Sequence, residues 1–303
     1  MSPHLFWRSL RHRHDWRGSL FKRGGCAIKY AIRSARDGEL HAAWLDFIYH
    51  HPVMTAMLTK DPRLLERPQH DYINRRLNRF ERYAVIADHY RTVLTTFPPG
   101  LCESIYLHGQ FRVGTLSLKD GTALLIELRR PTGRGREGEL CLCLANATGQ
   151  MLSSMIFSIA DGGHTLLLGC VQGAAPALGR EAVRDLTKQS HGLRPKNLLL
   201  SMVRALAQHN GAIRVRGVSN TAHPFAGQAD KIKADYDSFW LECHGTLDES
   251  GFYELPAHEP VREEIHIPSK HRSAFRQREA LRREACALLL ATLDGREDLA
   301  LVV

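Results

Sequence analysis

The stretch QSHGLRPKNLL, residues 189–199, carries residue types that can hold phosphate groups at the start of a helix. Pro195 suits the first helical position, because its missing N–H would be unpaired there. The free amides and the dipole of such a helix start attract an anion, and Gly192 lets a pyrophosphate approach the backbone closely. The sequence therefore predicts an anion site with these candidate binding residues: Gln189, Gly192, Leu193, Arg194 and Lys196.

Two other interpretations of this stretch stay open. In one, Gly192 lies in the turn of a helix-turn-helix motif, but apolar residues dominate the second helix and leave few side chains to read bases. Nucleic acid is therefore not the expected partner. In the other, the stretch is an ordinary start of a core helix, and a nearby carboxylate neutralises Arg194 and Lys196, whose charge is unfavourable at a helix N-terminus.

The same stretch resembles the acyl-CoA pyrophosphate loop of the GCN5-related N-acetyltransferase superfamily, which reads Q/R-x-x-G-x-G/A. Gln189 and Gly192 match this pattern, whereas Arg194 replaces the final small residue. The order of strands and helices that follows is also similar. The resemblance implies an acetyltransferase-like sheet, and acyl-CoA or an acyl carrier protein as the cofactor.

Acyl transfer needs a base for the acceptor and a proton donor for the leaving thiolate. His223, just past a predicted strand, is the candidate base, because histidine titrates near neutral pH. Asn220 is a candidate to bind the acyl carbonyl or a substrate hydroxyl, and Tyr236 to protonate the departing sulfur, as a tyrosine does in many members of that superfamily. Glu242 and His244 form a second acid–base candidate.

Each candidate also has a structural interpretation. The two histidines, His223 and His244, are compatible with hydrogen-bonded packing residues. Tyr236, Phe239 and Trp240 fall at helical spacing, which is typical of a core. No His or Cys cluster has the spacing of a metal site, so no metal is expected.

The positive charge of the chain is concentrated at its beginning. The 303 residues carry a formal net charge of +9, and residues 1–36 contain nine Lys or Arg against one acid, Asp15. That segment therefore carries +8, which leaves +1 for the remaining 267 residues. Its aromatic residues stand among these arginines and lysines: Phe6, Trp7, Trp16, Phe21 and Tyr30.

Such a basic and aromatic segment predicts binding to an anionic membrane surface. Nucleic acid would suit the same mixture, and a solvated helix is the third interpretation. The segment has no uninterrupted apolar stretch of a secretory signal, and no window of the chain is apolar enough for a membrane span. The seven scattered cysteines fit reduced thiols. We expect a cytoplasmic protein, peripheral on the inner membrane.

The periodicity of apolar residues predicts an α+β fold. Residues 37–97 favour helices, one of them at about 72–97. The predicted strands are 104–108, 111–118, 122–130, 139–146, 151–160 and 164–172. The elements predicted after them are helices at 180–188 and 195–208, a strand at 213–220, a helix within 231–245, a strand at 251–256 and a basic helix at 270–293. The expected units are a basic aromatic segment (1–36), a helical region (37–100), an acetyltransferase-like α+β core (101–268) and a basic C-terminal helix (269–303).

Over residues 40–280 the chain resembles the VirK/YbjX family of Gram-negative bacteria. The resemblance rests on four runs: GLRPKNLLLSMVRALAQ, IRVRGVSNTAHPF, KADYDSFWLECHGTLDESGFYELP and IPSKHRSAFRQR. It implies a cytoplasmic or membrane-associated protein linked to virulence, to surface-protein localisation and to lipid A properties that affect antimicrobial peptide resistance. Its partner would be an envelope lipid or a surface protein. The family supplies no catalytic residues, so an acyltransferase and a non-catalytic adaptor both remain hypotheses.

Overall fold

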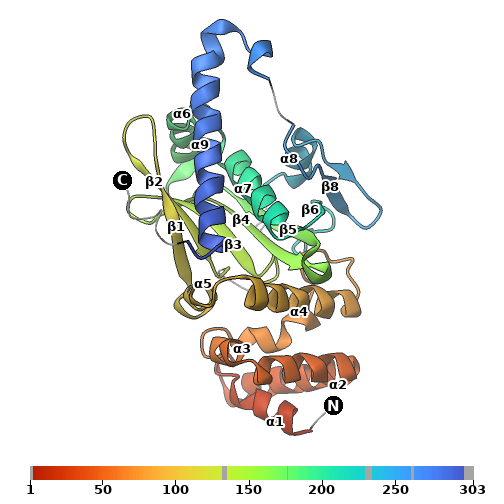
Figure 1. Ribbon diagram of the computed structural model, residues 1–303. Helices are drawn as coiled ribbons and strands as arrows, with labels where there is room; N and C mark the ends of the chain where they lie inside the picture. Colours follow the sequence, from red (N-terminus) through yellow and green to blue (C-terminus); the bar gives the residue numbers. More distant parts are fainter. Residues whose placement is uncertain (1–2, 132–134, 176, 229–233, 261–262, 297–303) are drawn as a thin grey trace.

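The computed structural model describes residues 3–131, 135–175, 177–228, 234–260 and 263–296. They are built around one eight-stranded sheet, whose strand order is β1-β2-β3-β4-β5-β6-β8-β7 (Figure 1). The strands are β1 (Gln110–Ser117), β2 (Ala123–Arg129), β3 (Leu140–Asn146), β4 (Met151–Ala160), β5 (Thr165–Gln172), β6 (Arg214–Val218), β7 (Thr246–Leu247) and β8 (Phe252–Leu255). Strands β1 to β5 form the expected antiparallel meander. The predicted α+β class is confirmed.

The helices lie before and after this meander. They are α1 (Pro3–Arg11), α2 (Leu20–His50), α3 (Pro52–Met57), the 3-10 helix η1 (Pro62–Gln69), α4 (Arg79–Thr96), α5 (Pro99–Glu103), α6 (Gly179–Gln189), α7 (Pro195–His209), α8 (Tyr236–Glu242) and α9 (Ser269–Leu293). The helices expected at 180–188, 195–208 and 270–293 are thus present. The helix expected within 231–245 is shorter than predicted, and residues 231–233 lie outside the described residues.

Two of the sequence-based boundaries are wrong. The segment 104–108 is a π-helical turn, η2 (Ser104–His108), because it continues α5 and places the Tyr106 hydroxyl 2.7 Å from His89 Nε2 in the core. The helix predicted from residue 72 begins at Arg79. Asn78 caps its first turn, and Glu81 completes the capping box, which fixes the start of α4 at this point.

Helices α4, α7 and α9 pack on the sheet, and α4 lies between the sheet and the N-terminal helices. Helix α7 packs on β3, β4 and β5, and α9 packs on β1 and α7, whereas α4 packs on β4. Figure 1 shows α4 between the sheet and helices α1 to α3. The buried apolar residues form one continuous cluster that extends from Trp44 in α2 to Leu293 in α9. Removing this apolar surface from water is the main term that stabilises the fold.

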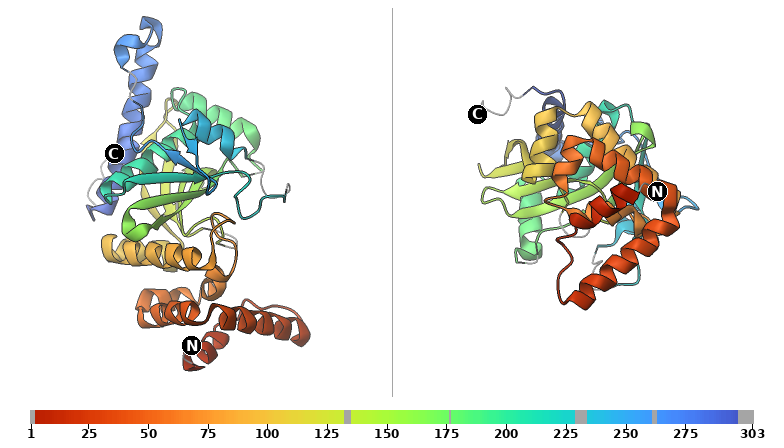
Figure 2. Two further views of the ribbon diagram at one scale, coloured as in Figure 1. Left: turned by 90° about the vertical axis from the view of Figure 1, so that its right-hand side faces the viewer. Right: turned by 90° about the horizontal axis from the view of Figure 1, so that it is seen from below.

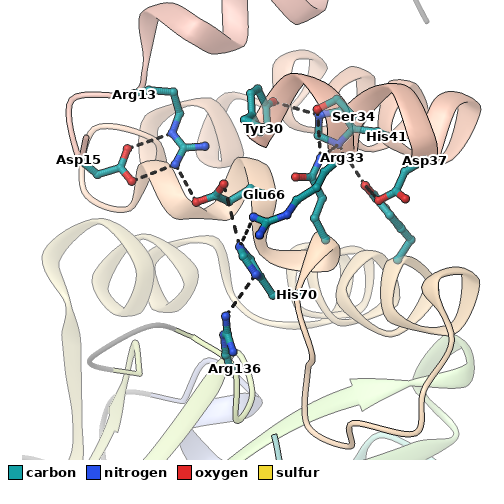
Figure 3. Close-up of polar contacts among 12 residues, drawn as sticks. Arg13, Asp15, Tyr30, Arg33, Ser34, Asp37, His41, Glu66, His70 and Arg136 are labelled. Atoms are coloured by element: carbon teal, nitrogen blue, oxygen red, sulfur yellow. Dashed lines mark hydrogen bonds and ion pairs between the residues drawn. The ribbon is translucent and has the colours of Figure 1, made fainter. Parts of the chain in front are cut away.

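The N-terminal helices are attached to this body through buried polar contacts. Helix α2 has a kink at Gly38 (φ 50°), so the boundary expected after residue 36 lies inside this helix, just before the kink. Arg13, almost fully buried, pairs with Asp15 at 2.9 Å and with Glu66 of η1 at 2.8 Å (Figure 3). These pairs fix the turn between α1 and α2 against η1. Within the described part of the chain, no helix has the length and apolar character needed to cross a membrane.

Candidate functional site

The parallel pair β5 and β6 separates before β5 ends. The two strands are paired from Thr165↔Arg214 to Leu168↔Gly217, and β5 then continues without β6 as far as Gln172. Helix α7 connects β5 to β6, after α6. Ligand sites of α/β sheets commonly lie outside the carboxyl ends of parallel strands, so a ligand site is expected at this opening.

A cavity of about 400 Å³ occupies this opening. One side is formed by the end of β5 and by Ser153 of β4, and the others by α6, the start of α7 and the start of α8. Its lining is mostly apolar, with the cations Arg194 and Lys196 at the start of α7 and the carboxylate of Asp235 at the start of α8. The lining residues are Ser153, Val171, Gln172, Gly173, Val183, Thr187, Arg194, Pro195, Lys196, Ala234, Asp235, Tyr236, Ser238 and Phe239.

Two of the predicted anion-binding residues, Arg194 and Lys196, line this cavity. The Arg194 guanidinium lies 2.8 Å from a Glu242 carboxylate oxygen, and the Lys196 Nζ lies 3.5 Å from it. The hydrogen bond from Arg194, followed by the charge of Lys196, lowers the pKa of Glu242 below its usual value. These side chains are partly exposed, and exposed ion pairs of this kind contribute only about 0.2–1 kcal/mol. Glu242 therefore holds Arg194 and Lys196 only weakly.

Several of the backbone amides expected to be free in this loop and helix start are bonded within the protein. At the start of α7, the Asn197 and Leu198 amides donate to the Arg194 carbonyl, at 2.9 Å and 3.2 Å. The Gly192 amide donates to the Thr187 carbonyl at 2.8 Å, and the Leu193 amide donates to the Ser190 carbonyl at 2.9 Å.

The chain leaves α6 through two left-handed residues, His191 (φ 56°) and Gly192 (φ 84°), and Gly192 takes this conformation without strain because it has no Cβ. Gln189 is the last residue of α6, and its carbonyl accepts from the Lys119 amide. The cationic groups at this helix start are the side chains of Arg194, the N-cap residue, and Lys196.

Tyr236 is one of the residues that line the cavity, but its hydroxyl contacts Cys170, which does not line it. The hydroxyl donates to the Cys170 sulfur at 3.3 Å. Burial raises the pKa values of both the Tyr236 phenol and the Cys170 thiol well above their usual values, so both groups stay protonated. The role expected for Tyr236, proton donor to a bound thiolate, would require breaking its bond to Cys170.

Asn220 holds α8 in place instead of facing a ligand. Its side-chain oxygen accepts from the Tyr236 amide at 2.9 Å, and its side-chain nitrogen donates to Asp235 at 2.9 Å. The backbone amide of Asn220 donates to the Asp237 carboxylate at 2.8 Å. Asn220 is thus bonded at both ends of its side-chain amide to the start of α8, and it is not among the residues that line the cavity.

His223 is fully buried behind Tyr236. Its ring stacks on the Tyr236 ring, with centroids 5.3 Å apart. His223 Nδ1 accepts from the Phe225 amide at 3.2 Å, so the proton of the neutral ring is on Nε2, which faces Glu137 Oε1 at 3.2 Å. His223 is not among the residues that line the cavity. The structure brings His223 and Tyr236 together, as part of a buried cluster with Cys170 and Glu137.

Glu242 and His244, the second acid–base candidate, are not joined to each other in the structure. Glu242 is held by Arg194 and Lys196, and its lowered pKa keeps it ionised near neutral pH. His244 is exposed and follows the end of α8 in a left-handed conformation with φ 63°. In the described ranges, no three His, Cys, Asp or Glu side chains are grouped to hold a metal ion.

Glu137 and Cys170, which contact His223 and Tyr236, were not among the site residues predicted from the sequence. The chain at Glu137 crosses directly over β5, where a Cβ on Gly169 would lie 1.9 Å from the Glu137 carbonyl oxygen. A glycine inside an apolar strand often marks such a close approach. Gly169 within TLLLGCVQ is therefore the signal in the sequence, although it does not say which segment approaches.

The fold and the cavity together define an α+β protein with a ligand-sized site beside a β-α-β crossover. The chain belongs to the family described as "Protein of unknown function (DUF535)", which matches residues 21–286. The resemblance to the VirK/YbjX family is thereby confirmed.

Several proteins are similar to this chain. It is 28% identical over 269 residues to the "Uncharacterized protein YbjX" of Escherichia coli K12, covering 86% of this chain and 81% of that protein. Two uncharacterized proteins of Haemophilus influenzae are 33% identical over 128 residues (42% of this chain, 43% of the relative) and 24% identical over 236 residues (77% and 79%). A solved structure of a cAMP-binding acyltransferase from Mycobacterium smegmatis matches with 10% identity over 68% of this chain and 62% of that one. Its TM-score, 0.28, is below the level that marks a shared fold.

Proposed function

We propose that the cavity beside β5 and α7 binds an acyl donor, acyl-CoA or the acyl-phosphopantetheine of an acyl carrier protein. The observation that carries the proposal is the combination of an apolar cavity with two cations on one side. Arg194 and Lys196 would hold the phosphates, and Val171, Val183 and Phe239 would surround the apolar part. An acyl donor combines these two chemistries in one molecule.

Acyl transfer to an envelope lipid or surface protein is the activity we propose for this site. The envelope as the place of action, with effects on virulence and on antimicrobial peptide resistance, is supported by the family resemblance. The bound donor would supply an activated thioester. This chain's own residues would bind the phosphates, exclude water from the apolar part and orient the donor.

A second candidate function is the same binding without transfer, in an adaptor for envelope biogenesis. Two contacts favour it. The Tyr236 hydroxyl already donates to Cys170, and the Glu242 carboxylate is held by Arg194 at 2.8 Å. The base expected at His223 is buried against Glu137. Among the described lining residues, Asp235 is the only carboxylate, and its hydrogen bonds to Ser238 and Asn220 lower its pKa.

Thermal unfolding with and without long-chain acyl-CoA tests the binding proposal. A ligand that binds only the folded state at 100 times its Kd stabilises that state by about 2.7 kcal/mol. We expect acyl-CoA to raise the Tm of the full chain, and the double variant Arg194→Glu/Lys196→Glu to lose this rise. Arg184→Glu is the matched control, because Arg184 lies on α6, is 76% exposed and does not line the cavity.

Release of free CoA separates the two candidates. With an envelope lipid extract as acceptor, a transferase releases CoA in proportion to enzyme and time, whereas an adaptor retains the acyl-CoA. An unchanged Tm at saturating acyl-CoA would contradict both candidates. A rise in Tm that persists in the double variant would contradict the assignment of the phosphates to Arg194 and Lys196.

A further inference from the structure

The first half of α2 exposes an apolar face that no described part of the chain covers. Phe21 is 94% exposed, Leu20 81%, Ile32 63% and Ile28 62%. At about 100° per residue, these four side chains fall within a sector of about 120° on the helix surface. Monomeric proteins rarely expose such a grouped set of large apolar side chains without a binding partner.

Basic residues border this face along one side. Lys22, Lys29, Arg33 and Arg36 occupy the neighbouring sector of about 60°. Residues 16–36 contain six Lys or Arg and no acid. Arg36 pairs with Asp37 at 2.9 Å and Arg33 lies 3.3 Å from His70, whereas Lys22 and Lys29 make no ion pair with any described residue. The apolar face therefore carries a positive border that an anionic surface would neutralise.

The opposite side of the same helix packs against the protein, so the exposed apolar face is not needed for contacts within the chain. The Tyr30 hydroxyl lies 2.9 Å from both Ser9 Oγ and His41 Nε2, and the Tyr83 hydroxyl donates to Asp37 at 3.1 Å. Arg33 reaches His70 at 3.3 Å, as Figure 3 shows. These contacts hold α2 by its buried side and leave the apolar face outward.

The position of the helix suits a flat partner. In the left view of Figure 2, the first half of α2 extends sideways beyond the sheet and lies at the end of the molecule farthest from α9. A bilayer that contacts this end meets helices α1 and α2 before it meets the sheet (Figure 2).

We propose that this face of α2, formed by Leu20, Phe21, Ile28 and Ile32, docks the protein on an anionic lipid bilayer. The apolar side chains enter the boundary between headgroups and acyl chains, and the bordering Lys22 and Lys29 contact the lipid phosphates. Charge complementarity decides for a membrane over a second copy of this chain, because two such faces would bring their basic borders together. The proposal does not depend on what the cavity binds.

Sedimentation of the full chain with sucrose-loaded vesicles tests the proposal. We expect the protein to sediment with vesicles that contain phosphatidylglycerol and not with vesicles of phosphatidylcholine alone. The double variant Phe21→Glu/Ile28→Glu should bind about a hundredfold more weakly, since two apolar side chains leave the bilayer. Ile213→Glu is the matched control, because Ile213 is 72% exposed but lies at the start of β6. It should bind like the unaltered chain.

Three results would overturn the proposal. They are equal sedimentation of the double variant and the unaltered chain, no preference for phosphatidylglycerol, and a dimer without vesicles that the double variant converts to a monomer. The last result would assign the face to self-association. Circular dichroism and acyl-CoA binding of the double variant should match those of the unaltered chain, which separates this proposal from the one on the cavity.

Discussion

The Tyr236 hydroxyl donates to the Cys170 sulfur at 3.3 Å, while Tyr236 is also one of the residues that line the cavity. Tyr236 therefore contributes its apolar surface to the cavity and its polar atom to the protein interior. A hydroxyl so placed stabilises the junction of β5 and α8 and has no free proton to offer a ligand.

Tyr236→Phe tests this division. The variant keeps the ring, so its affinity for acyl-CoA should stay within about twofold of the unaltered protein. The free energy of unfolding should fall by about 0.5–1.5 kcal/mol, the usual net contribution of one hydrogen bond. Titration calorimetry and urea unfolding measure the two quantities. A tenfold loss of affinity with unchanged stability would mean that the hydroxyl faces the ligand.

Glu242→Gln should strengthen the binding of an anionic ligand. Glu242 now neutralises Arg194 and Lys196, and an incoming phosphate has to replace it. Removing its charge should tighten binding of acyl-CoA about twofold to fivefold, in line with the small energies of exposed ion pairs. The effect should shrink at high salt, because salt screens these charges. Weaker binding in Glu242→Gln would show that Glu242 itself contacts the ligand.

The local part of this fold could be predicted from the sequence. Asp120-Gly121 between two apolar runs places the hairpin of β1 and β2, and the structure has these strands at Gln110–Ser117 and Ala123–Arg129. Pro195 likewise marks the first residue of α7. Such signals depend on a few neighbouring residues and need no knowledge of the tertiary structure.

The candidate site was harder to predict because it depends on contacts between distant segments. The loop at Gln189–Arg194 looks like a phosphate loop by residue type, but its amides close the end of α6. Arg194 and Lys196 do line the cavity, and the carboxylate that neutralises them is 46 residues or more away, at Glu242. Glu137 reaches His223 only because its segment crosses β5 at Gly169.

Acid should destabilise the protein through histidines that are buried in neutral form. Burial lowers the pKa of His41 to about 4 and that of His89 to about 3, below the ordinary value of 6.5. Between pH 6.5 and the lowered pKa of each histidine, the unfolded chain binds more protons than the folded chain. The free energy of unfolding should therefore decrease as the pH falls from 6.5 toward 4, by up to about 1.4 kcal/mol per pH unit for each histidine.

His41→Gln should reduce this pH dependence. His41 Nδ1 lies 3.1 Å from the Tyr83 hydroxyl and 3.4 Å from the Gln69 side-chain nitrogen, and His41 Nε2 lies 2.9 Å from the Tyr30 hydroxyl. An uncharged amide can replace these bonds without titrating. Urea unfolding at pH 7 and pH 5 measures the change. An equal loss of stability in the variant and the unaltered chain would show that His41 does not contribute to the acid effect.

Filling the cavity tests the central claim most directly. Val183 lies on α6 and lines the cavity, whereas its neighbour Arg184 is 76% exposed and does not. Long-chain acyl-CoA is titrated into the unaltered chain, Val183→Trp and Arg184→Trp, and the heat of binding is measured. The account predicts binding to the unaltered chain and to Arg184→Trp, and at least tenfold weaker binding to Val183→Trp. Equal binding to all three proteins, or to none, would contradict it.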